Sequence, residues 1–139
     1  DASTVRGREL AEAMPFMRKT SMQLASKMRF ISAQLVALFE NDAAVALGNA
    51  RNANAMAARL YDGVIALAAR HPQISVPNRA EANAVFPILP ADVAERVLES
   101  YRFYVWNQAT GQVRWMCSWD TTESDVDGIL GVLEAALEG

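Results

Sequence analysis

The chain has 139 residues, 52% of them hydrophobic and 21% charged, which fits one globular domain with a hydrophobic core. Its net charge is −3 and its pI is about 5.1, so it lacks the basic surface that nucleic-acid binding requires. A single cysteine excludes an internal disulfide. Neither a signal-like segment nor an uninterrupted apolar run of about 18 residues is present, so we expect a cytoplasmic protein with no membrane partner.

The first half of the chain has the apolar spacing of helices. Residues 1–8 are polar and show no periodicity. Between residues 22 and 39 apolar side chains recur at steps of three and four: Leu24, Met28, Ile31, Leu35 and Leu38. Asn41 and Asp42 are expected to end this helix and to begin a second one over residues 42–70. The two helices are predicted to form a hairpin.

The second half changes to short β-type runs separated by turn residues. Runs at residues 74–76, 84–88 and 103–106 predict strands, and Pro87 places the second at an edge or a bulge. Residues 91–100 predict a short amphipathic helix. Residues 112–119 alternate, with one face formed by Val113, Trp115, Cys117 and Trp119. A final helix is expected after a threonine N-cap, so the fold class is α+β, a long helical hairpin followed by a small, mostly antiparallel sheet with helices on one face.

Few residues suggest chemistry that the chain could perform alone. His71, beside a proline, is interpreted as a helix cap or turn residue, Cys117 as a core residue, and Asn83 as a turn residue. No metal site is expected. Arg114 lies in mid-strand among aromatic and apolar neighbours, where a guanidinium needs an anionic partner. That partner is either a ligand carboxylate or phosphate, or an acid in a structural ion pair.

A second group of cations surrounds the start of the first predicted long helix. Arg18 and Lys19 precede it, and Lys27 and Arg29 lie close to its beginning. Positive charge is unfavourable at the positive end of a helix dipole unless an anion compensates it. The group therefore predicts either a nearby anion or an ordinary solvated surface.

Three stretches together resemble threonine aldolases in the region that follows the lysine carrying their pyridoxal phosphate (PLP). They are PFMRKTSMQLASKMRFISAQLVAL, EANAVFPILP and VRWMCSWDTTESDVDGILGVL, and the similarity extends from about residue 8 to residue 137. The low-specificity and phenylserine aldolases are the most similar branch. The resemblance implies the small C-terminal domain of a fold-type-I PLP enzyme that cleaves β-hydroxy-α-amino acids to glycine and an aldehyde.

The resemblance also assigns residues and partners. Arg114 matches the family arginine that holds the substrate carboxylate. Arg29 and one of two lysines, Lys19 or alternatively Lys27, match basic residues near the cofactor phosphate or a subunit interface. Residues 1–20 would be a segment and connector from a large domain, and residues 21–139 the small domain. The cofactor lysine belongs to that large domain, which the chain lacks, so no catalytic residue is assigned here.

Taken alone, the chain is therefore expected neither to bind PLP tightly nor to cleave an amino acid. Its expected partners are the large PLP-binding domain, further copies in a homodimer or homotetramer, and a small amino acid substrate. Two alternatives remain from the sequence. One is a non-catalytic protein-interaction module, and the other is the small domain of a different fold-type-I PLP lyase.

Overall fold

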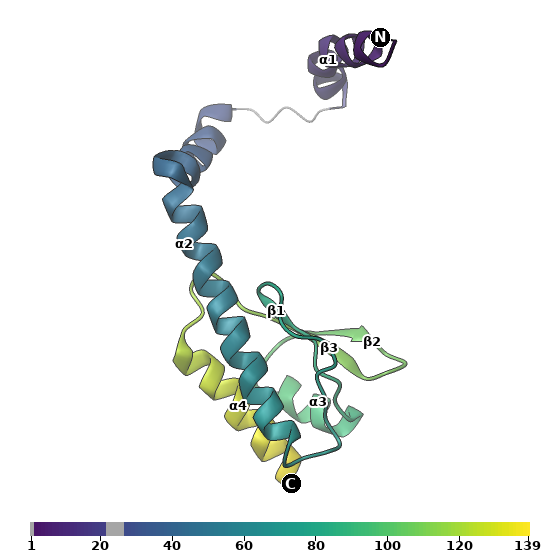
Figure 1. Ribbon diagram of the computed structural model, residues 1–139, viewed down its shortest axis with the longest axis vertical. Helices are drawn as coiled ribbons and strands as arrows, with labels where there is room; N and C mark the ends of the chain where they lie inside the picture. The colour runs from purple at the N-terminus through teal and green to yellow at the C-terminus, as the bar shows by residue number, and fades with distance from the viewer. Residues whose placement is uncertain (1, 22–26) are drawn as a thin grey trace. The chain divides into compact units, whose positions relative to one another are not determined.

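The computed structural model describes residues 2–21 and 27–139 and contains two compact units, Asp1–Ala44 and Val45–Gly139 (Figure 1). We call these unit 1 and unit 2. The elements in chain order are α1 (Ala2–Thr20), α2 (Met28–Ala68), β1 (Ala84–Val85), α3 (Ala91–Leu98), β2 (Tyr104–Asn107), β3 (Gln112–Met116) and α4 (Glu123–Glu138). The predicted α+β class is confirmed.

Unit 1 contains a helix for which the sequence analysis gave no prediction. Helix α1 includes residues 2–8, where periodicity is lacking, and the residues that follow at 9–14 (ELAEAM) are strong helix formers. Its last turn carries Arg18 and Lys19, where positive charge suits the negative end of the helix dipole. Residues 22–26 of the predicted first long helix, including Leu24, lie outside the described residues.

Helix α2 is broken where the sequence predicts a break. Asn41, Asp42 and Ala43 have φ values of 52°, 57° and 58°, so the helical backbone stops after Phe39 and resumes beyond Ala43. Asparagine and aspartate enter this left-handed region more readily than other non-glycine residues, which explains why the break falls here. The two predicted helices are therefore present as the two halves of α2, and their packing as a hairpin stays a prediction.

The second half of α2 is a core helix of unit 2. By length and composition alone, α2 is the one helix within residues 2–21 and 27–139 that could cross a membrane. Its second half nevertheless buries Ala57, Leu60, Val64 and Leu67 against the rest of unit 2. Figure 1 shows α4 running beside this half of α2. The two helices approach closely at Gly63, because a Cβ there would collide with the side chain of Leu130.

The sheet has the strand order β1-β3-β2, with both pairs antiparallel. Tyr104 pairs with Arg114, and Ala84 pairs with Met116, so these four side chains share one face. Strand β1 is at an edge, as Pro87 predicts. The predicted strand at residues 74–76 is reduced to a single bridge between Ser75 and Ile88.

The three helices of unit 2 pack on the other face of the sheet. The core joins α2, α3 and α4 to the inward side chains Val85, Val113 and Trp115, with the helix side chains Leu60, Val64, Val93, Val97, Val126, Ile129 and Leu133. Helices on one face of a small antiparallel sheet are the predicted architecture. The prediction that Trp119 shares a face with Val113, Trp115 and Cys117 is wrong. Strand β3 ends at Met116, so the alternation stops there and the Trp119 side chain is exposed.

Candidate functional site

Arg114 lies in the central strand, and its guanidinium is held between two aromatic rings on the outer face of the sheet. Its Cζ atom is 5.6 Å from the ring centroid of Tyr104 and 5.3 Å from that of Trp106. Both rings belong to β2, whose register with β3 places them on the same face as Arg114. Cation–π attraction of this kind contributes roughly 0.5–1 kcal/mol at an exposed site. The contacts therefore restrict where the guanidinium can point.

The aromatic surface around Arg114 is open. Tyr104 is 72% exposed and Trp106 57% exposed. Phe86 supports Trp106 edge to face, with ring centroids 5.4 Å apart and an interplanar angle of 64°. Met116 is also exposed on this face. We call Phe86, Tyr104, Trp106, Arg114 and Met116 the outer aromatic face.

Arg114 has no acidic partner among residues 2–21 and 27–139. Arg59, Arg70 and Arg96 each pair with a carboxylate, whereas no salt bridge forms at Arg114. The Arg114 Nε atom is buried without a hydrogen-bond acceptor. An unsatisfied buried donor costs about 1–3 kcal/mol, which an incoming anion would recover. The sequence left two partners open for Arg114, a ligand anion or an acidic side chain. No acidic side chain pairs with it in the described part of the chain.

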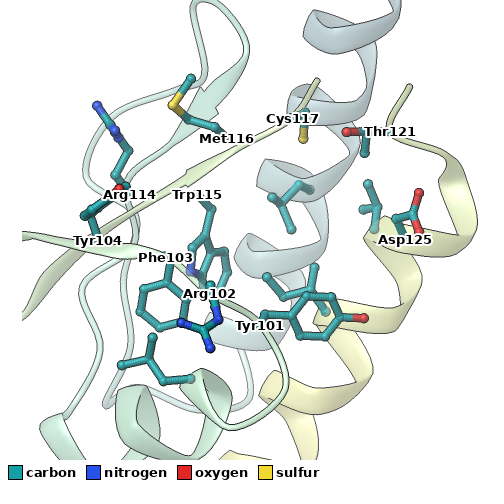
Figure 2. Close-up of a pocket in the computed structure, with 14 residues that line it drawn as sticks. Tyr101, Arg102, Phe103, Tyr104, Arg114, Trp115, Met116, Cys117, Thr121 and Asp125 are labelled. Carbon is teal, nitrogen blue, oxygen red and sulfur yellow. The ribbon is translucent and has the colours of Figure 1, made fainter. Parts of the chain in front are cut away.

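Strand β3 also borders a cavity, which we call the inner cavity. It has a volume of about 540 Å³, and its lining combines Tyr104, Arg114 and Met116 of the outer aromatic face with Leu60, Tyr101, Arg102, Phe103, Trp115 and Ile129. Figure 2 shows Arg114 and Met116 on one side of β3 and Trp115 on the other. Trp115 is 3% exposed, so it is a core residue.

Cys117 also lines the inner cavity and is buried. Burial raises the pKa of the Cys117 thiol, because the thiolate would lose its solvation. A thiol with a raised pKa is a poor nucleophile at neutral pH. The structure therefore agrees with the interpretation of Cys117 as a core residue.

The segment after β3 is held by two amide side chains. Asn83, interpreted as a turn residue, lies in a bend just before β1; its Nδ2 also donates to the Cys117 carbonyl at 2.8 Å, and its backbone carbonyl accepts from the Cys117 N–H. Asn52 of α2 donates to the carbonyls of Trp119 and Thr121, both at 3.0 Å. These partners are 34 to 69 positions away in the sequence, so no local pattern could have identified them.

Helix α4 begins with the predicted threonine cap. The Thr122 hydroxyl accepts from the Asp125 N–H, and the Asp125 carboxylate accepts from the Thr122 N–H at 2.8 Å. The pKa of Asp125 lies below its usual range because its carboxylate is hydrogen-bonded, mainly to the Thr122 hydroxyl and also to the Thr122 N–H. Arg59 then ties α4 to α2, because its guanidinium donates to Asp127 at 2.9 Å and lies 3.3 Å from Glu123.

The predicted basic group belongs to unit 1, whereas Arg114 belongs to unit 2. Lys19 is exposed in the last turn of α1, and Lys27 is exposed with a φ of 58° just before α2. The Arg29 guanidinium lies 5.0 Å from the ring centroid of Phe30. Their proposed contacts with a cofactor phosphate or a subunit interface stay predictions.

Other chemistry has little support in residues 2–21 and 27–139. No group of three or more histidine, cysteine, aspartate or glutamate side chains is placed to hold a metal ion there. The backbone N–H of His71 donates to the Leu67 carbonyl as α2 ends, in agreement with its interpretation as a residue of a helix end. The outer aromatic face around Arg114 is the candidate functional site.

Comparison with known proteins agrees with the resemblance seen in the sequence. No protein-family model matches the chain. The chain is 37% identical over 134 residues to a low specificity L-threonine aldolase of a Pseudomonas species, covering 94% of this chain and 36% of that protein. It is 39% identical over 115 residues to a low specificity L-threonine aldolase of Pseudomonas aeruginosa, covering 82% of this chain and 31% of that protein. The chain therefore spans about a third of the length of these relatives.

Proposed function

We propose that this chain, which is threonine aldolase-like over nearly its whole length, works as the C-terminal part of a PLP-dependent lyase. Such an enzyme would cleave a β-hydroxy-α-amino acid to glycine and an aldehyde. The substrate would be of the threonine or phenylserine type. In this proposal the chain supplies Arg114 for the substrate carboxylate, and the rest of the active site comes from the part of the enzyme that corresponds to the other two thirds of the relatives.

The unpaired guanidinium of Arg114 carries this proposal. It offers a planar fork of N–H donors that matches the two oxygens of a carboxylate. Tyr104 and Trp106 hold it in place, so less side-chain freedom is lost when a substrate binds. Its role is to bind and orient the amino acid at one end, so that the bond to be broken is presented to the catalytic groups of the other part.

PLP is the cofactor that threonine aldolases use, but the residues of this chain do not fit it. A lysine that bonds a carbonyl cofactor works from a desolvated pocket. Lys19 and Lys27 are both exposed. We therefore assign no step of the cofactor chemistry to this chain and propose that it is inactive alone.

The proposal can be tested in a hybrid enzyme, in which this chain replaces the matching third of the Pseudomonas relative. The hybrid is expected to cleave L-threonine. Arg114→Gln should raise its KM about 10- to 100-fold, because a charge-assisted hydrogen-bond pair to the carboxylate is lost. Arg114→Lys keeps the positive charge but lacks the planar pair of donors, so its KM should lie between those of the unmodified hybrid and Arg114→Gln. PLP content, measured by visible absorbance, should stay the same in all three.

Arg96→Gln provides the matched control. Arg96 makes a surface pair with Asp92 at 2.7 Å within α3, so its loss should change KM less than twofold. An unchanged KM for Arg114→Gln in an active hybrid would remove the carboxylate assignment. A loss of PLP together with the loss of activity would instead show that Arg114 supports the fold or the cofactor site.

A second candidate function, protein interaction, is favoured by the surface of unit 1. Its helices expose a series of large apolar side chains: Leu10, Met14, Phe16, Met17, Phe30, Ile31, Leu35, Val36 and Phe39. In the enzyme proposal this surface contacts the PLP-binding part or a neighbouring subunit. If interaction were the whole function, the hybrid would be inactive while the chain alone formed a stable, defined oligomer in sedimentation experiments.

A further inference from the structure

We propose that Phe86 is a positioning residue, which sets the direction of the Arg114 guanidinium by acting through the ring of Trp106. Phe86 follows β1, whereas Trp106 belongs to β2, and β3 lies between these two strands. The positioning of the guanidinium follows from the contacts of these three side chains. Its effect on substrate binding rests on the proposed function.

The register of the sheet places Phe86 opposite Arg114. Three neighbouring pairs share one antiparallel register: Ala84 with Met116, Val85 with Trp115, and Ile88 with Gln112. In this register Phe86 is the residue that faces Arg114, and the alternation of side chains puts the Phe86 ring on the outer face. Arg114 therefore has Phe86 as its neighbour on one side and Tyr104 of β2 as its neighbour on the other.

The backbone that carries the Phe86 ring is tied to β3. Gln112 Nε2 donates to the Phe86 carbonyl at 3.4 Å, and the Val113 N–H donates to the Pro87 carbonyl at 2.9 Å. Pro87 is buried, and a proline restricts the residue before it to extended backbone. The Phe86 ring therefore projects from a backbone with little freedom to move away from β3.

The Phe86 and Trp106 rings meet on the outer side of β3. Their centroids are 5.4 Å apart at an interplanar angle of 64°, the edge-to-face arrangement that aromatic pairs prefer. Trp106 needs this support, because it is 57% exposed and lies at the irregularity in the pairing between Val105 and Asn107. Without the Phe86 ring, the indole would be free to turn away from the Arg114 Cζ atom, which now lies 5.3 Å from its ring centroid.

A carboxylate requires an aligned guanidinium, because its two oxygens accept two parallel hydrogen bonds from the planar fork. An arginine side chain has many rotamers, so contacts that restrict it favour binding. Tyr104 and Trp106 provide these contacts for Arg114, and Phe86 fixes one of the two rings. Loss of the Phe86 ring should therefore weaken carboxylate binding while the positive charge remains.

The positioning is tested in the ¹⁵N-labelled 139-residue chain by following the Arg114 Nε–H signal by NMR, with Arg114→Lys to assign it. Burial of Nε slows the exchange of its proton with water, and the Tyr104 and Trp106 rings shift its signal. Phe86→Leu and Phe86→Met keep an apolar side chain without the ring. Both should move the signal toward that of an exposed arginine and speed its exchange, while Phe86→Tyr, which keeps the ring, should preserve it.

Phe103 provides the matched control. It is half-buried like Phe86 and makes the same kind of edge-to-face contact, with centroids 5.9 Å apart, to Trp115. Figure 2 shows Phe103 and Trp115 on the side of β3 away from the Arg114 guanidinium. Phe103→Leu should shift the Trp115 indole N–H signal and leave the Arg114 Nε–H signal in place, and Phe86→Leu should do the reverse.

Two further measurements test the route and its consequence. In a Trp106→Leu background, Phe86→Leu should cause no further change in the Arg114 signal, because the ring that it acts through is gone. In the hybrid enzyme, Phe86→Leu should raise KM for L-threonine about two- to tenfold, the size of one aromatic contact, and change kcat less than about twofold.

The proposal is overturned if the ring-less Phe86 variants fold and leave the Arg114 Nε–H signal unchanged, or if they shift it equally with and without Trp106. It is also overturned if Arg114→Gln raises KM in the hybrid while Phe86→Leu leaves KM unchanged. If the Arg114 signal moves but neither Arg114→Gln nor Phe86→Leu changes KM, the positioning by Phe86 is supported and the carboxylate role proposed for Arg114 fails.

Discussion

Two glycines three positions apart in α4 are expected to respond in opposite ways to substitution by alanine. Alanine favours a helix interior over glycine by about 1 kcal/mol. A Cβ at Gly131 would meet no atom within 4 Å, so Gly131→Ala should stabilise unit 2 by about that amount. At Gly128 the same gain is opposed by the Tyr101 hydroxyl, 2.5 Å from the new Cβ. Overpacking of this kind costs about 1–3 kcal/mol, so Gly128→Ala should be neutral or destabilising.

Urea unfolding followed by tryptophan fluorescence measures this difference. With a slope of about 2 kcal/mol per molar urea, the midpoints of the two variants should differ by roughly 0.5–1.5 M. Tyr101→Phe is the control, because the nearest remaining ring atom, Cζ, would lie 3.8 Å from the alanine Cβ. In the Tyr101→Phe background the two alanine variants should become similarly stabilising. Equal stabilisation by both variants in the native background would show that the Tyr101 hydroxyl does not pack against α4 at Gly128.

The shifted pKa values of Asp125 and Cys117 have measurable consequences. The pKa of Asp125 is lowered in the folded protein by its hydrogen bonds with Thr122. The ionised carboxylate therefore adds to the free energy of unfolding at pH values above the unfolded pKa, near 4. This stabilisation is lost as the pH falls through the lower folded pKa. Asp125→Asn should therefore flatten the acid side of the stability profile, and an unchanged profile in urea titrations from pH 6 to pH 2 would contradict the cap. The buried Cys117 thiol, whose pKa is raised, should react with iodoacetamide at pH 8 far more slowly in native chain than in urea-unfolded chain, as followed by intact mass. Equal rates would show that the inner cavity opens freely.

Much of unit 2 could be predicted because its signals are local. The apolar stripe of α2, the alternation of β3 and the Thr122 cap each depend on residues within a few positions of one another. The break at Asn41 and Asp42 was predictable for the same reason, since these residue types tolerate left-handed backbone. Helix α1 was missed because its propensity is not accompanied by a regular apolar stripe.

The candidate site could be predicted only in part because it depends on pairing between strands. The sequence pattern identified Arg114 as unusual, but not its aromatic neighbours. Tyr104 and Trp106 reach it through the β2–β3 register, which includes an irregularity between Val105 and Asn107. The roles of Asn52 and Asn83 likewise depend on contacts between distant parts of the chain.

We propose that this chain supplies substrate binding to a PLP enzyme without holding the cofactor itself. The decisive experiment is a PLP titration of the purified chain, with borohydride reduction and intact mass to detect a covalent adduct. We expect no saturable change in visible absorbance and no adduct, because Lys19 and Lys27 are both exposed. A stoichiometric adduct on Lys19 or Lys27 would contradict it and make the chain a cofactor-binding protein in its own right.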